Sequence, residues 1–222
     1  GVILDHGSVR AVHRTFVETL VDHYQLNDSP TEALGTWREA VGNHFHERGE
    51  NEFRLAEDAY HRAIESVVGS PVERSEWRPL FDEAFTEHIE PEPEAVSTLT
   101  TLAERDIHVG IISDIDDREA DAILATFGLE PVFDSVTTSE EVGRTKPDQQ
   151  MFDTALGKAS VPAEHSLMIG DRYSHDMLGG DEAGMWTIAY GADGGPAVDF
   201  RAESLPDVLA IVDGDHADLR ED

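Results

Sequence analysis

Apolar positions in the first half of the chain repeat at the spacing of a helix face. The clearest run is Val12, Phe16, Leu20 and Tyr24. A four-residue repeat brings side chains onto one side of a helix. The segment "SPTE" at residues 29–32 predicts a second helix start, because Ser is a preferred cap, Pro suits the first helical position and Glu follows three residues after the cap. Residues 53–68 and 77–88 keep the helical pattern, so we predict a helical region over residues 10–90.

The pattern changes after "EPEPE" at residues 90–94, where two prolines disfavour both a helix and a central strand and so predict a hinge. Beyond it, the short apolar segments "HVGIIS", "VFDSVTT", "SLMIG" and "MWTIAY" alternate with helical stretches. Such alternation is typical of a parallel sheet covered by helices on both faces. The predicted helices are residues 95–105, 118–127 (stopped by Gly128), 148–159 and 176–183.

The chain opens on another apolar run, "GVIL", which predicts a short first strand at residues 2–4. The helical region of residues 10–90 then interrupts the α/β pattern. We therefore predict a doubly wound, Rossmann-like α/β core domain formed by residues 1–9 and 91–222, with an all-helical domain of residues 10–90 inserted after the first strand.

Polar residues follow the predicted strands at their carboxyl ends. Asp5 ends the first apolar run, Ser113 ends "VGIIS", and Asp171 follows "SLMIG". Lys146 precedes a predicted helix, and Asp176 lies five residues beyond Asp171. Because ligands of open α/β sheets bind at the carboxyl ends of the strands, we expect these side chains to share one cleft.

This set of residue types suits phosphoryl transfer. A carboxylate can attack phosphorus and form an acyl phosphate. Several neighbouring carboxylates repel one another unless a hard divalent cation such as Mg²⁺ binds among them. A lysine and a hydroxyl group can hold the phosphoryl oxygens and stabilise the transition state.

Four segments resemble, in order, the motifs of the haloacid dehalogenase-like (HAD) hydrolase superfamily: "GVILD", "VGIIS", "GRTKPDQQMF" and "LMIGDRYSHD". The resemblance covers essentially the whole chain, and "GDEAGMWTIAY" resembles the segment that follows. It implies a core with an inserted helical cap that closes over the site and selects the leaving group. It also implies that Asp5 is the nucleophile and a metal ligand, that Asp171 binds Mg²⁺, and that Asp176 binds the ion or supports the site. Ser113 and Lys146 would grip the phosphate.

The sequence departs from the family pattern at residue 7. Phosphatases of the family usually carry a second Asp there, which protonates the leaving group, but this chain has Gly7. The backbone carbonyl of Gly7 still suits Mg²⁺. Loss of a general acid/base costs on the order of 10²–10⁴ in rate, unless another donor such as His6, a candidate substrate contact, or a cap residue replaces it.

Three interpretations stay open. The first is a Mg²⁺-dependent phosphatase of a small phosphorylated metabolite, by analogy a phosphoglycolate-type compound or a sugar phosphate. The second is a metal-independent 2-haloacid dehalogenase, although "IGD" at residues 169–171 favours a cation. The third is a weakly active or inactive relative with a binding role. The phosphonoacetaldehyde hydrolase branch is excluded, because residues 10–90 hold no lysine for its Schiff base.

Charge and composition narrow the class of protein further. Asp and Glu number 47 against 16 Lys and Arg, which gives a net charge of −31. Acidic charge spread over the whole chain is typical of proteins in a salty cytoplasm, where counterions screen self-repulsion. No basic stripe is available for nucleic acid. The absence of cysteine excludes disulfides and thiolate metal sites.

No run of about 18 apolar residues predicts a membrane span, and no secretory signal is visible. We expect a cytoplasmic monomer or homodimer. Some polar groups have a simpler interpretation than a site. Asp114, Asp116 and Asp117 read as a solvated helix start, and His44 and His46 lack metal-ligand spacing.

Overall fold

The computed structural model describes residues 1–214, and their contacts divide the chain into two compact units. One is an α/β unit, made of Gly1–Ile3 and the chain from Pro91 onward. The other is a helical unit, Leu4–Glu90. No helix among the described residues has the length and apolarity that a membrane span requires.

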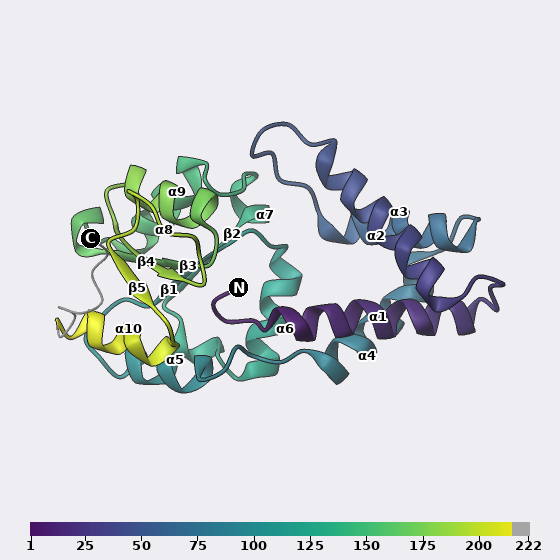
Figure 1. Ribbon diagram of the computed structural model, residues 1–222, viewed down its shortest axis with the longest axis horizontal. Coiled ribbons are helices and arrows are strands. Elements are labelled where there is room, and N and C mark those ends of the chain that lie inside the picture. Colours follow the sequence, from purple (N-terminus) through teal and green to yellow (C-terminus); the bar gives the residue numbers. More distant parts are fainter. Residues whose placement is uncertain (215–222) are drawn as a thin grey trace. The chain divides into compact units, whose positions relative to one another are not determined.

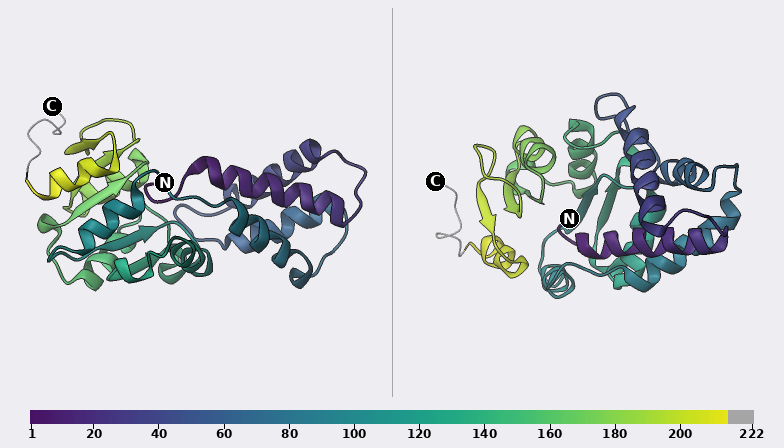
Figure 2. Two further views of the ribbon diagram at one scale, coloured as in Figure 1. Left: turned by 90° about the horizontal axis from the view of Figure 1, so that it is seen from below. Right: turned by 45° about the vertical axis from the view of Figure 1, so that its right-hand side comes forward.

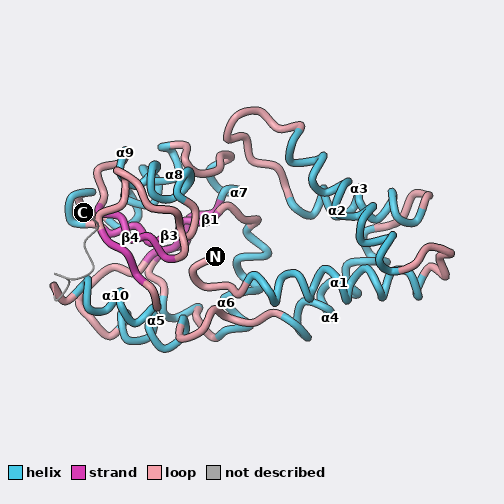
Figure 3. Tube along the Cα trace, in the orientation of Figure 1, coloured by secondary structure: helices cyan, strands magenta, loops and turns pink. Residues whose placement is uncertain are grey.

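The helical unit contains four helices (Figures 1 and 3). Aromatic side chains pack against one another between them. Helix α1 contacts α2 and α4, and α2 contacts α3. The predicted apolar face is confirmed for Val12, Phe16 and Leu20, which are at most 2% exposed. The predicted start at Ser29 is confirmed as well, because Ser29 and Glu32 form a reciprocal capping box. The helices are α1 (His6–His23), α2 (Pro30–His46), α3 (Ala56–Val68) and α4 (Arg74–His88).

The α/β unit contains two parallel sheets, which confirms the predicted fold class. The first sheet pairs β1 (Gly110–Ser113) with β2 (Ser135–Thr138). The second has the order β3 (Leu167–Gly170), β4 (Trp186–Tyr190) and β5 (Phe200–Ala202). Figure 2 shows these strands among the helices of the unit in two further views.

Helices and short turns connect the strands of this unit. Its α-helices are α5 (Ala95–Ala103), α6 (Asp117–Phe127), α7 (Ser139–Val142), α8 (Gln149–Ala159), α9 (Leu178–Glu182) and α10 (Leu205–Val212). The short turns are the 3₁₀ segments η1 (Glu130–Val132) and η2 (Ala163–His165) and the π-helical η3 (Tyr173–Met177). The predicted stop of α6 is confirmed, because Gly128 takes the left-handed conformation (φ 67°) that favours glycine after a helix.

Both faces of the second sheet are buried, as the doubly wound pattern requires. On one face, Ile188 of β4 packs with Leu102 of α5 and with Val208 of α10. The next residue of β4, Ala189, faces the opposite way and packs with Met177 of η3. Helix α8 contributes Met151 and Phe152, which pack with Met168 of β3. Two apolar layers therefore enclose the strands.

The predicted strand at residues 2–4 is wrong. Only Leu4 makes an isolated bridge, and residues 1–3 are irregular. The hydrogen bonds of this bridge go to the hinge segment: Glu92 N donates to Ile3 O (2.8 Å), and Asp5 N donates to Glu90 O (3.1 Å). Because the hinge segment satisfies these groups, they form no ladder with a neighbouring strand.

Candidate active site

The candidate site lies at the carboxyl ends of β1 and β3 in the α/β unit. Ser113 is the last residue of β1, and Asp171 directly follows β3. Within residues 1–214, the Ser113 hydroxyl makes no hydrogen bond. An unpartnered hydroxyl at a strand end is available to donate to an anionic ligand.

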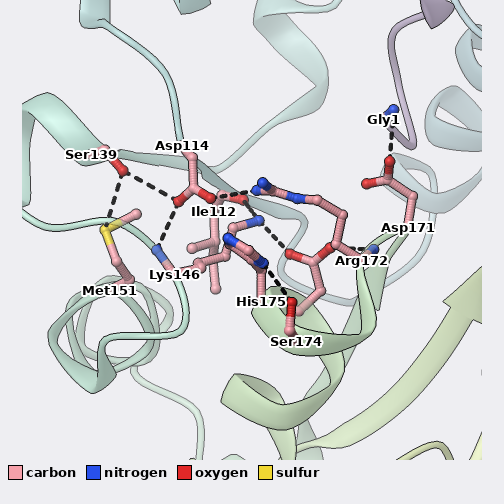
Figure 4. A network of polar contacts seen from close by, with 11 residues as sticks. Gly1, Ile112, Asp114, Ser139, Lys146, Met151, Asp171, Arg172, Ser174 and His175 are labelled. Atoms are coloured by element: carbon pink, nitrogen blue, oxygen red, sulfur yellow. Dashed lines mark hydrogen bonds and ion pairs between the residues drawn. The ribbon is translucent and has the colours of Figure 1, made fainter. Parts of the chain in front are cut away.

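Lys146 lies in the segment between α7 and α8 and is only 7% exposed. Its ammonium group donates to Asp176 Oδ1 (2.6 Å) and to the backbone oxygen of Ile112 in β1 (3.1 Å) (Figure 4). An ammonium carries three N–H donors. Two are used to fix the side chain, so one is left for a ligand.

Asp176 lies in the π-helical turn η3 and is 1% exposed. Besides Lys146, it accepts a hydrogen bond from Arg172 N through Oδ2 (2.9 Å). The predicted helix start at residue 176 is therefore wrong: the chain is already wound from Tyr173, as a π turn. Such turns are common at functional sites, and here the turn points the Asp176 carboxylate inward. Both its oxygens are hydrogen-bonded, which suits the supporting role among the two that the sequence left open.

Gly170 makes this inward turn possible. A Cβ at Gly170 would lie 2.1 Å from the Asp176 Cβ, so any side chain here would collide with it. The glycine of the Gly-Asp pair in the fourth motif thus has a steric basis, because it lets η3 approach the end of β3. Asp171 is the next residue, directly after the carboxyl end of that strand.

Asp171 is a partly exposed carboxylate at the carboxyl end of β3. Its side chain is 26% exposed, and Oδ2 lies 3.0 Å from the terminal nitrogen of Gly1. Among residues 1–214, no group of three or more His, Asp or Glu side chains is gathered for a metal ion. Mg²⁺ needs only one or two carboxylates when substrate oxygens and water complete its shell. The oxygen donor at Asp171 fits that requirement.

Asp114 is part of this network, and the expectation of a solvated helix start is wrong for it. Its side chain is only 15% exposed. Oδ1 accepts from Lys146 N (2.8 Å) and from Ser139 Oγ (3.3 Å), and Oδ2 is paired with Arg172 Nη2. Asp116 is also buried, at 7% exposure. The signal that could have identified Asp114 is its place directly after Ser113, at the same strand end.

His175 lies beside this cluster, in η3. Burial is the main cause that lowers the pKa of its imidazole, and the nearby Arg172 guanidinium lowers the pKa further. Its Nδ1 and Ser174 Oγ are 2.9 Å apart and share a hydrogen bond. No motif or spacing in the sequence singles out this histidine.

The other three predicted site residues, Asp5, His6 and Gly7, belong to the helical unit. Asp5 is the N-cap of α1, and its Oδ1 accepts from Ser8 N (2.6 Å). A Cβ at Gly7 would lie 2.8 Å from that same oxygen. Glycine at position 7 therefore leaves room for the capping carboxylate, and His6 is exposed. Their catalytic roles stay predictions from the sequence.

Comparison with protein families gives one clear match. A family model described as haloacid dehalogenase-like hydrolase matches residues 15–190. The match spans the segments of Ser113, Lys146, Asp171 and Asp176, and it begins after the segment of Asp5.

Relatives and solved structures agree with this match. The chain is 35% identical over 100 residues to a glyceraldehyde 3-phosphate phosphatase of Methanothermobacter thermautotrophicus (45% of this chain, 44% of the relative). It is 31% identical over 139 residues to a ribulose-1,5-bisphosphate 5-phosphatase of Halopiger xanaduensis (59% and 56%). The chain thus spans about half the length of these relatives. The magnesium-bound HAD-hydrolase YfnB of Bacillus subtilis shares the fold, with a TM-score of 0.72 and 18% identity over 96% of this chain and 94% of YfnB.

Proposed function

Because the chain belongs to the family of haloacid dehalogenase-like hydrolases, we propose that it is a Mg²⁺-dependent phosphatase of small phosphomonoesters. The observation that carries the proposal is the fixed ammonium of Lys146, which keeps one N–H for a ligand at the carboxyl edge of β1. The unpartnered hydroxyl of Ser113 lies at the carboxyl end of β1, and the partly exposed carboxylate of Asp171 lies at the carboxyl end of β3 in the second sheet. A tetrahedral dianion beside a divalent cation satisfies all three groups.

Each residue has a separate task in the proposed reaction. Lys146 and Ser113 bind the non-bridging phosphoryl oxygens and stabilise their charge in the transition state. Asp176 keeps the Lys146 ammonium in place, and Gly170 leaves the space that the Asp176 side chain occupies. Asp171, with Asp5 and the Gly7 carbonyl, would hold Mg²⁺, which supplies positive charge to the phosphoryl group when bound.

Asp5 is the proposed nucleophile. An oxygen of its carboxylate forms a bond to phosphorus while the bond from phosphorus to the ester oxygen breaks, and the leaving alkoxide takes up a proton. Water then attacks the aspartyl phosphate, and inorganic phosphate leaves with the carboxylate of Asp5 restored. Because residue 7 is glycine, the proton comes from another donor, and substrates with acidic leaving groups should react fastest.

The glycine at position 7 is also compatible with the second candidate function, that of a 2-haloacid dehalogenase. That reaction needs no acid at the leaving group, because a halide ion departs unprotonated. Asp5 would then attack carbon and form an ester, and water would hydrolyse it. The carboxylate of Asp171 directly after β3 favours the phosphatase, because an oxygen donor at that strand end suits a divalent cation.

One pair of assays separates the candidates. Release of p-nitrophenol from p-nitrophenyl phosphate and of chloride from 2-chloropropionate are measured at molar KCl, with Mg²⁺ and with a chelator. The phosphatase proposal expects phosphate ester hydrolysis that the chelator and Asp5→Asn both abolish. Chloride release that the chelator does not affect would replace it with the dehalogenase. A folded protein without either activity would support the binding role instead.

A further inference from the structure

Arg172 spans the carboxyl ends of strands from the two sheets. It follows Asp171 at the end of β3, and its guanidinium is paired with Asp114, which follows Ser113 at the end of β1 (Figure 4). Its backbone N–H is bonded to Asp176. The backbone and the guanidinium of Arg172 therefore both bind residues of the candidate site, although the side chain is 47% exposed.

The guanidinium keeps most of its donors for a ligand. Arginine has five N–H donors in a rigid planar fork, suited to a carboxylate or a phosphate. Within residues 1–214, only Nη2 of Arg172 makes a side-chain hydrogen bond, to Asp114. Because that ion pair already orders the side chain, binding an anion costs less conformational entropy than it would for a free surface arginine.

Asp114 links this exposed cation to the buried one. The oxygen that does not pair with Arg172 accepts from Lys146 N, so one carboxylate contacts both residues. The carboxyl ends of the strands thus carry two positive groups: Lys146, which is 7% exposed, and Arg172, whose side chain is open to solvent. A substrate held at Lys146 by one phosphoryl group would place a neighbouring group near Arg172.

The charge of the chain makes this cation selective. With a net charge of −31, the protein repels anions over most of its surface. A substrate with a second negative group would therefore bind poorly unless a fixed cation met that group. Arg172 supplies such a cation, and Asp114 occupies only the Nη2 group of its guanidinium.

We propose that Arg172 is a specificity-determining residue, which binds a second anionic group of the substrate, a carboxylate or a second phosphoryl group, while Lys146 and Ser113 hold the phosphoryl group that is removed. The proposal rests on the phosphatase function proposed above. Asp114 is the positioning residue, since it acts through Arg172.

The test compares two classes of substrate in the full-length chain. One class carries a second anion: 2-phosphoglycolate for the carboxylate, and fructose 1,6-bisphosphate for the second phosphoryl group. The other class, p-nitrophenyl phosphate and glycerol 2-phosphate, carries none. The kcat/KM of Arg172→Gln is measured for all four, at the lowest KCl concentration that keeps the wild type folded, so that screening is least.

The expected result is a loss on the order of 10- to 100-fold for at least one substrate with a second anion, against less than about 3-fold for the two without. The substrate that loses more identifies the second group as carboxylate or phosphoryl. Arg172→Lys should recover part of the loss, and Asp114→Asn, which keeps an oxygen for Lys146 N, should show a smaller loss on the same substrates.

Arg105→Gln is the matched control. It removes the same charge from the same unit and breaks the ion pair between Arg105 and Asp213 (2.8 Å). Arg105 precedes β1 in the chain, so it lies near the amino end of that strand and not at its carboxyl end. It should change neither class of substrate. Thermal unfolding of each variant shows whether it is folded. If Arg172→Gln is not folded, the two classes of substrate are compared in Arg172→Lys instead.

Equal losses for both classes in Arg172→Gln, or no loss in either, would overturn the role of Arg172 and leave the phosphatase function standing. A wild type that hydrolyses none of the four esters would instead refute the phosphatase function, and the role of Arg172 with it.

Discussion

The ammonium of Lys146 lies 2.6 Å from Asp176 Oδ1, and the two side chains are 8% and 2% exposed. A buried ion pair is expensive to break, because removal of one partner leaves the other charge without water or a counter-charge. This pair therefore joins stability to function: the same contact that fixes the proposed phosphate ligand also holds η3 against the segment before α8.

The two lysines of the chain provide a matched test of this pair. Lys146→Met should lower the free energy of unfolding by about 3–5 kcal/mol, because Asp176 is left buried and unpaired. Lys158→Met breaks an ion pair with Glu141 in which the side chains are 29% and 42% exposed, and should cost less than about 1 kcal/mol. Urea denaturation of both variants measures the difference. A loss in Lys146→Met as small as the one expected for Lys158→Met would show that the Lys146–Asp176 pair is not a stabilising contact.

Gly170→Ala should destabilise the α/β unit by about 1–3 kcal/mol. The added methyl group would meet the Asp176 side chain at 2.1 Å, and relief requires η3 to move away from β3. Gly157→Ala in α8 is the control with the opposite sign: a Cβ there has open space, and alanine in a helix is favoured by roughly 0.5–1 kcal/mol. Thermal unfolding of the two variants should shift in opposite directions, and a neutral Gly170→Ala would contradict the steric role.

The helical unit should lose stability as the pH falls from about 6.5 to 4. Burial, and secondarily Arg38, lower the pKa of His13 from 6.5 to about 4, so the fold favours the neutral imidazole. The contribution of the neutral His13 to the free energy of unfolding is complete above pH 6.5. It is lost progressively below pH 6.5, because the unfolded chain takes up the proton at a higher pH than the folded chain does. The whole loss is up to about 3 kcal/mol.

His13→Phe tests this dependence, because it keeps an aromatic ring beside Trp37 and Tyr60 without a titrating group. The free energy of unfolding of the variant, relative to the wild type, should rise between pH 7 and pH 4 in chemical denaturation. His46→Gln, at an exposed position, is the control. Parallel curves for His13→Phe and the wild type would mean that His13 makes no such contribution.

Local chemistry explains which parts of the fold could be predicted. The cap at Ser29 and the helix end at Gly128 depend on residues within one turn, so the sequence identifies them directly. The strands that end at Ser113 and Gly170 are visible as short apolar runs between helical stretches. Their order along the chain also predicts that Lys146 and Asp171 lie at the carboxyl ends of strands. The structure places these strand ends in two sheets, and the roles of the two residues stay predictions.

Features that depend on distant partners could not be predicted in this way. Residues 2–4 have the composition of a strand, but the backbone groups beside Leu4 bond to the hinge instead. Asp114 looks like an ordinary helix-start carboxylate, and only the folded chain brings it to Arg172 and Lys146 N, which are 58 and 32 residues away. The π turn at Asp176 likewise depends on the room that Gly170 leaves.

The Mg²⁺ dependence of p-nitrophenyl phosphate hydrolysis at molar KCl, measured in the wild type and in Asp171→Asn, tests the proposed phosphatase function directly. Hydrolysis by the wild type should require Mg²⁺ and saturate with it. In Asp171→Asn, activity should fall at least about 100-fold, or need a much higher Mg²⁺ concentration, because the accessible carboxylate is lost. Hydrolysis that continues without Mg²⁺, or a variant that keeps the wild-type Mg²⁺ dependence, would contradict the proposed function.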